Sequence, residues 1–170
     1  MEGTFRGGHL LPNVNDGIPN SDLPDLDAIS IIVHELRAAM TEIPDEPFRG
    51  AKTIFPSVWC EWASIGTAEV LKERGLGDWT FVSAGLPDSP SGHAWLELRD
   101  TDGTAMYSID ITLDQFDSWD APYVGPGQSP AAALYRDERF AGWWRDWPVV
   151  SRNDSYARYA KALADGMRPD

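Results

Sequence analysis

The sequence contains very little cysteine and histidine, and this limits the chemistry open to it. Cys60 is the single cysteine among 170 residues, so an internal disulfide is impossible. One thiol cannot build a thiolate zinc site, and the three histidines, His9, His34 and His93, show no metal-ligand spacing. The sequence therefore predicts neither a metal site nor a cofactor.

Positive charge is also scarce. Fourteen Lys and Arg residues stand against 27 Asp and Glu residues, which gives a formal net charge of −13. This balance argues against a nucleic-acid backbone or an anionic membrane as the main partner. It is typical of a solvated acidic surface, and it favours a basic polypeptide or an amine as substrate.

Long apolar runs are missing as well. No stretch approaches the length of about 18 residues that a membrane span needs, and no basic segment is followed by an apolar one. We therefore expect neither a membrane span nor a standard secretory signal. A cytoplasmic location fits the single cysteine, although a cysteine-poor exported protein would show the same count.

The rest of the composition indicates a packed globule. The chain is 42% hydrophobic and contains eight tryptophans. Residues 1–25 are rich in Gly, Pro, Asn and Asp and are predicted to form an irregular arm. Residues 26–170 contain no linker and no repeat, so they are predicted to form one domain.

Two helices are predicted in the first half of this domain. The first begins near Leu26 and ends before Pro44 and Pro47, with His34 on its solvated side. Its apolar positions follow helical spacing: Ile29, Ile32, Val33, Leu36 and Met40. After an extended segment over residues 48–57, the second helix is predicted to have Ser57 as N-cap and Cys60 in its first turn, and to end at Gly75 and Gly77.

Strands are predicted next, over residues 79–85, 93–99 and 104–111. The last two are joined by the turn sequence DTDG at residues 100–103, which indicates a hairpin. Residues 114–130 are predicted to form a loop, and residues 131–144 and 154–164 two further helices. The tryptophans 143, 144 and 147 are interpreted as packing residues. This order of elements predicts an α+β fold, with N-terminal helices on a small antiparallel sheet followed by C-terminal helices.

Cys60, His93 and Asp110 form a combination that can carry out nucleophilic catalysis. A cysteine in the first turn of a helix lies at the positive end of the helix dipole, which favours its thiolate. A histidine on a nearby strand can take the thiol proton, and an aspartate on the paired strand can orient the imidazole. Each residue also has a structural interpretation: Cys60 as a small core residue, His93 as a buried strand residue, and Asp110 as a strand residue facing solvent.

The same segments resemble a known family. Cys60 at a helix start, the run His93-Ala94-Trp95 with Glu97, and Asp110 with Thr112 are similar to the transglutaminase-like branch of the papain-fold cysteine enzymes. The resemblance covers roughly residues 56–116. It implies a papain-like core and a Cys-His-Asp triad acting on amide bonds, as in peptidases, deamidases and transglutaminases.

The resemblance leaves two points open. The oxyanion donor is predicted to be the backbone N–H of Cys60, with the side chain of Trp59 as a second candidate. Glu97 lies on the same strand face as His93, where a structural role is favoured.

The sequence is compatible with two classes of function. The leading hypothesis is a cysteine-dependent acyl-transfer enzyme that acts on a peptide or protein amide. The alternative is a non-catalytic binding or accessory module that retains the fold, or an acidic decoy that mimics a nucleic acid. A reactive Cys60 would distinguish the first from the second.

Overall fold

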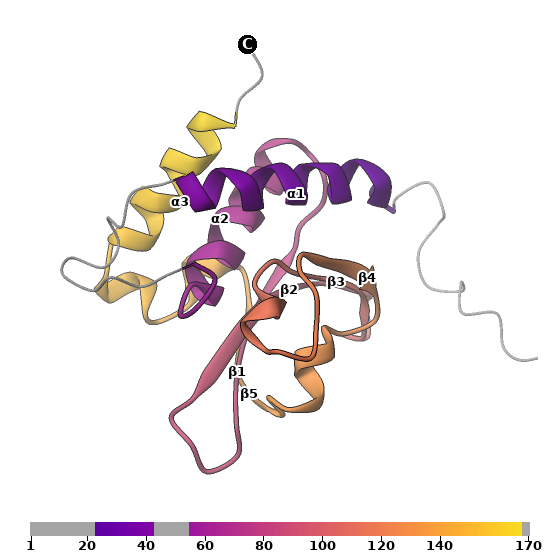
Figure 1. The fold of residues 1–170 in the computed structure, drawn as a ribbon, viewed down its shortest axis with the longest axis vertical. Coiled ribbons are helices and arrows are strands. Elements are labelled where there is room, and N and C mark those ends of the chain that lie inside the picture. The colour runs from indigo at the N-terminus through magenta and orange to yellow at the C-terminus, as the bar shows by residue number, and fades with distance from the viewer. Residues whose placement is uncertain (1–22, 43–54, 168–170) are drawn as a thin grey trace, which may run out of the picture.

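The protein has a layer of helices on one face of an antiparallel sheet (Figure 1). The computed structural model describes residues 23–42 and 55–167, and the predicted α+β class is confirmed within them. The helices are α1 (Leu26–Glu42), α2 (Cys60–Glu73) and α3 (Ser155–Gly166). The strands are β1 (Thr80–Gly85), β2 (Gly92–Arg99), β3 (Ala105–Asp110), β4 (Tyr123–Pro126) and β5 (Asp137–Gly142), in the order β4-β3-β2-β1-β5.

Helix α2 is the central element of the helical layer, because it contacts α1, α3 and the strands β1, β2 and β3. The apolar stripe predicted for α1 is confirmed, since its buried residues are Ile29, Ile32, Val33, Leu36 and Met40. Helix α3 was predicted over residues 154–164 and is also confirmed. A Cβ atom on Gly66 would lie 2.7 Å from Leu163 Cδ2, so this glycine allows α2 and α3 to approach closely.

The two ends of α2 differ in how well the sequence predicted them. Gly75 has φ +68° and donates to Lys72 O, and the next residue donates to Leu71 O, as expected for a glycine-terminated helix. At the other end, Ser57 is not the N-cap. Trp59 takes that position without a side-chain cap, because Trp59 N donates to Pro56 O and closes a turn before the helix begins at Cys60.

The predicted hairpin of β2 and β3 is confirmed. Leu96 pairs with Ile109, and the turn is closed by a bond from Asp100 N to Thr104 O. The carboxylate of Asp100 accepts from the N–H groups of Asp102 and Thr104, which stabilises the turn without any long-range contact.

The helix predicted over residues 131–144 is wrong. Residues 130–133 form a single 3-10 turn, η2 (Pro130–Ala133), and residues 137–142 form β5, which pairs with β1. Pairing with the open edge of β1 supplies backbone hydrogen bonds that outweigh a local helical preference. The packing role of the tryptophans is nevertheless confirmed, since Trp144 and Trp147 are buried.

The loop predicted over residues 114–130 also contains regular structure. A 3-10 turn, η1 (Leu113–Gln115), begins just before it, and β4 adds a strand to the edge of the sheet beside β3. The Gly and Pro residues that suggested a loop are compatible with an edge strand, because one side of such a strand needs no ladder donor.

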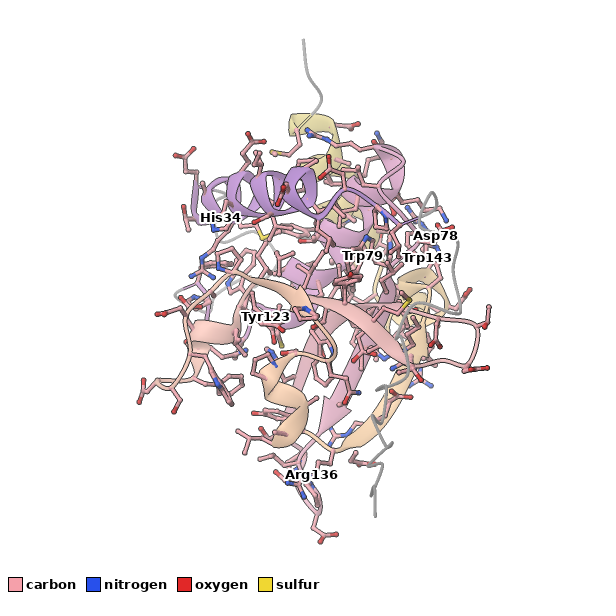
Figure 2. All side chains as sticks on the ribbon, turned by 90° about the vertical axis from the view of Figure 1, so that its right-hand side faces the viewer. His34, Asp78, Trp79, Tyr123, Arg136 and Trp143 are labelled. Carbon is pink, nitrogen blue, oxygen red and sulfur yellow. The ribbon has the colours of Figure 1, made fainter. Side chains whose placement is uncertain are left out.

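The sheet buries side chains on both of its faces. The helix-covered face carries the larger core, whereas the second face carries a smaller cluster made of Val82, Ala84, Trp95, Leu113, Ala131 and Tyr135. Figure 2 shows Arg136, from the segment next to this cluster, at the opposite end of the molecule from α1. His34 lies on the exposed side of α1, as predicted.

Several predictions concern residues that the structure does not describe. The arm predicted for residues 1–25 lies outside the described residues except at 23–25, and so do His9, Pro44, Pro47 and residues 48–54 of the extended segment. In the described ranges, no helix has the length and apolar character needed to cross a membrane.

Two isoleucines of α1 provide a matched test of this packing. Ile29 is fully buried, whereas Ile31 is 62% exposed on the same helix. We expect Ile29→Ala to lower the free energy of unfolding by about 2–5 kcal/mol, because it leaves a cavity, and Ile31→Ala to change it by less than about 0.5 kcal/mol. Urea unfolding followed by tryptophan fluorescence measures both. Equal effects of the two substitutions would contradict the assigned helix face.

Candidate active site

Cys60 is the first residue of α2 and is buried at the edge of the helical core. Its exposed fraction is 8%, and the turn before it carries Val58, which is 58% exposed. Val58 has φ +59°, which is unusual for a β-branched residue and marks a strained entry into the helix. The N–H groups of the first helical turn have no partner within the helix, so the thiol of Cys60 lies at the positive end of α2.

His93 and Asp110 meet on neighbouring strands at the ends nearest to Cys60. His93 Nε2 is 2.8 Å from Asp110 Oδ2, and both side chains are completely buried. Continuing the Leu96–Ile109 register places Asp110 opposite Trp95, so His93 and Asp110 form a diagonal pair on the second face of the sheet. The predicted neighbouring strands do bring these two side chains together.

The electrostatics of His93 favour its charged form. Burial lowers the pKa of the imidazole, but the charge and hydrogen bond of Asp110, together with the hydrogen bond and charge of Cys60, outweigh burial and raise the pKa to about 9. Cys60 thus lies close enough to His93 to raise the pKa of its imidazole, and His93 is hydrogen-bonded to Asp110, so all three predicted residues lie in one group.

Aromatic rings enclose the imidazole. The ring of Phe116 meets it edge-on at 5.0 Å between centroids, and Tyr135 and Trp95 lie at 5.6 and 5.9 Å. Trp95 and Tyr135 also line a pocket of about 250 Å³ with Val82, Ala84, Gln128, Ala132, Arg136 and Glu138. The second face of the sheet therefore presents a small pocket, lined by both apolar and polar side chains, beside His93.

Glu97 lies on the same face of the sheet as His93, but its hydrogen bonds go to other residues. Its carboxylate is fully buried and accepts from Trp95 Nε1 at 2.8 Å and from Arg99 Nε at 2.7 Å. Arg99 also bonds to Glu138. These contacts satisfy the buried charge of Glu97 and hold the Trp95 ring beside His93.

Gln115 contacts the second nitrogen of His93, a role that the sequence did not reveal. Its Nε2 atom is 2.7 Å from His93 Nδ1. The 3-10 turn η1 carries Gln115 back to the imidazole, with Gln115 N bonded to Thr112 O. Arg37 of α1 holds this turn by donating to Ile111 O and to the carboxylate of Asp114. The only sequence signal was the position of Gln115 just after the Asp110 strand.

Ser129 is a second residue that the sequence did not reveal. Its hydroxyl donates to Asp110 Oδ2 at 2.6 Å, the same oxygen that accepts from His93. The same Ser129 oxygen accepts from Ala131 N and begins the turn η2. The sequence indicated only a loop in this segment, and no local pattern linked Ser129 to Asp110.

Thr112 and Trp59, two further residues of the predicted site, are both buried. Thr112 is fully buried, and its hydroxyl oxygen, like Asp110 Oδ1, has no hydrogen-bond partner among the described residues. Trp59 is buried with its ring against Phe55 and Tyr159. These ring contacts place the Trp59 side chain in the packing around the start of α2.

A second acidic group lies next to Cys60. Glu61 accepts a 2.7 Å hydrogen bond from the hydroxyl of Tyr156, and burial raises the pKa of Glu61 although this hydrogen bond lowers it. Burial, followed by the negative charges of Glu61 and Cys60, raises the pKa of Tyr156. Tyr156 and Glu61 therefore border the thiol from α3 and α2.

Among residues 23–42 and 55–167, no group of three or more His, Cys, Asp or Glu side chains could hold a metal ion.

Comparison with known proteins adds no further information about this site. No protein-family model, no curated protein and no solved structure matches the chain.

The buried His93–Asp110 pair can be tested directly. Asp110 raises the pKa of His93 by its charge and its hydrogen bond, so we expect Asp110→Asn to lower that pKa by at least about one unit. Nitrogen-15 NMR of the histidine rings across pH measures the change. Ser118→Asn, which lies in the exposed segment after η1, is the control and should leave the titration unchanged. A His93 ring that titrates identically in wild type and Asp110→Asn would contradict the pairing.

Proposed function

We propose that this chain is a cysteine-dependent acyl-transfer enzyme that acts on amide bonds of peptides or proteins. Cys60 is the nucleophile, His93 the general base and acid, and Asp110 the residue that orients His93. This proposal includes a papain-like core of the transglutaminase-like type, with α2 and the β2–β3 hairpin as its central elements.

One observation carries this proposal: a thiol at a helix N-terminus lies close enough to an imidazole to raise its pKa, and Nε2 of that imidazole is bonded to a buried carboxylate. The helix dipole and a charged imidazole both stabilise a thiolate. A buried carboxylate paired with the imidazole keeps its proton on Nε2 and stabilises the imidazolium. These are the features that nucleophilic catalysis by cysteine needs.

The reaction follows from these contacts. The Cys60 proton passes to His93 Nδ1, and the thiolate attacks the amide carbonyl carbon to form a C–S bond. The backbone N–H of Cys60 donates to the oxyanion of the tetrahedral intermediate. The C–N bond then breaks as Nδ1–H gives its proton to the leaving nitrogen, and a thioester remains. Water or an amine attacks the thioester, gives its proton to His93 and releases the Cys60 thiolate.

The pocket beside His93 supports recognition of one substrate side chain. Its volume of about 250 Å³ is below the range typical of sites for whole drug-sized ligands. Trp95 and Tyr135 contact both the pocket and the imidazole, so a side chain held there would lie near the reacting amide. Peptidase, deamidase and transglutaminase activities differ only in the leaving group and the acceptor, and all three fit this arrangement.

A second candidate function is favoured by the complete burial of the His93 side chain. A binding or accessory module that retains the fold would have such a covered imidazole and no need for a reactive thiol. The two candidates differ in the chemistry of Cys60, which can be measured without a substrate.

Alkylation of Cys60 distinguishes these candidates. We expect iodoacetamide to react with a thiolate that persists well below the free-cysteine pKa of about 8.5. His93→Ala should move the pH profile back toward that value. Because Cys60 is the single cysteine, its reaction can be followed by mass spectrometry on the intact protein. A profile near 8.5 that His93→Ala leaves unchanged would favour the binding module.

Turnover distinguishes the roles of the three residues. A screen of glutamine-containing peptides and amine acceptors for ammonia release, cleavage or cross-linking comes first. We expect Cys60→Ala and His93→Ala to abolish activity. Asp110→Asn should leave a measurable remnant, with a loss smaller than the factor of about 10⁴ known from serine-protease triads, because a cysteine ionises more readily than a serine. Wild-type turnover by Cys60→Ala would refute the assignment.

A further inference from the structure

The contact between Gln115 and His93 has a chemical consequence for the resting site. Asp110 accepts only, so His93 Nε2 must carry a hydrogen, and Nδ1 is the nitrogen left for exchange with Cys60. Gln115 Nε2 lies 2.7 Å from that same Nδ1. A carboxamide nitrogen has hydrogens to donate and no free acceptor, so this contact is a hydrogen bond only while Nδ1 is unprotonated.

The surroundings keep Gln115 at this position. Arg37 of α1 bonds to the carboxylate of Asp114 and to the carbonyl of Ile111, which fixes both ends of the short turn before Gln115. On the following side, Phe116 packs edge-on against the imidazole. Helix α1, the turn η1 and the Phe116 ring thus together hold the Gln115 carboxamide against Nδ1.

We propose that Gln115 is a positioning residue that opposes protonation of His93 at Nδ1, so that the Cys60–His93 ion pair becomes more populated when this carboxamide turns or withdraws. This inference rests on the proposed function of Cys60 and His93. Asp110 and Cys60 favour the charged imidazole, and the donation from Gln115 acts against both of them. The resting protein therefore carries a restraint on its own nucleophile.

The same geometry indicates what releases the restraint. In acyl transfer, the proton on Nδ1 must pass to the leaving nitrogen of the substrate amide. In the resting structure an amide nitrogen, that of Gln115, already faces Nδ1. The substrate amide must take the place of the Gln115 carboxamide, so Gln115 moves during each turnover.

The proposal depends on the protonation of His93, so every ionisable group near the imidazole matters to its test. These groups are Cys60 of α2, Asp110 of β3, Tyr135 between η2 and β5, and the Arg37–Asp114 pair of α1 and η1, with Glu61 and Tyr156 bordering Cys60. A substitution at Gln115 changes none of these charges, which makes it a clean probe.

The experiment compares Gln115→Met with the parent in two backgrounds. In Cys60→Ala protein, nitrogen-15 NMR of the His93 ring should show a pKa raised by about half to one unit, because one hydrogen bond to the neutral ring is lost. In protein that retains Cys60, alkylation by iodoacetamide at pH 6 should become about three to ten times faster. The reason is that the same pKa shift of His93 raises the fraction of Cys60 present as thiolate by that factor. Thr101→Met, on an exposed residue of the turn between β2 and β3, is the control and should change neither value.

Gln115→Glu gives an independent check, because a carboxylate accepts from Nδ1–H and should raise the His93 pKa further than methionine does. If Gln115→Met leaves the His93 titration unchanged, or lowers its pKa, the proposal is overturned. If Cys60 reacts as an ordinary thiol in every variant, the proposed enzyme function fails. The NMR comparison in Cys60→Ala protein still decides the role of Gln115 in that case.

Discussion

Burial of the Asp110 carboxylate is the constraint on which the rest of this structure depends. A charge removed from water in the middle of a sheet is stable only when it is paired and hydrogen-bonded. Asp110 Oδ2 meets this requirement with two donors, His93 from β2 and Ser129 from the turn η2. The register of the β2–β3 hairpin positions His93. Ser129 is positioned by the chain segment that follows β4 and turns back toward Asp110. The sheet edge and the turns beyond it are therefore part of the site.

The two faces of the sheet serve different purposes. The helix-covered face contains the main core, in which α2 packs against both other helices and three strands. The second face carries the imidazole, its aromatic enclosure and the pocket, held by shorter elements. Cys60 belongs to the helical core, whereas His93 lies on the second face, so the site lies where the start of α2 meets the start of β2. The main core and the candidate site thus belong to different layers that meet at one end of the sheet.

The interactions that hold the side chains of this site together also close the site to solvent. The contacts that raise the pKa of His93 also bury its side chain completely, and aromatic rings close around it. Such an enclosure strengthens the electrostatic interactions inside it, because water is excluded. It also means that the proposed chemistry requires a local rearrangement. The segment from Thr112 to Phe116, which carries the contact to Nδ1, is the short element beside the imidazole from which that rearrangement would start.

The sequence determined the features that rest on local chemistry. The stripe of α1, the glycine end of α2, the Asp100 turn and the hairpin alternation follow from helical spacing, backbone conformation and side-chain capping within a few residues. These features were sufficient to place Cys60 at a helix start and to bring His93 and Asp110 onto paired strands. Tertiary structure decided what depends on distant partners. Residues 137–142 became β5 because β1 offered an open edge, and Gln115 and Ser129 reached the site because α1 and the turn η2 hold them there. No window of neighbouring residues contains those partners, so no local pattern could reveal these contacts.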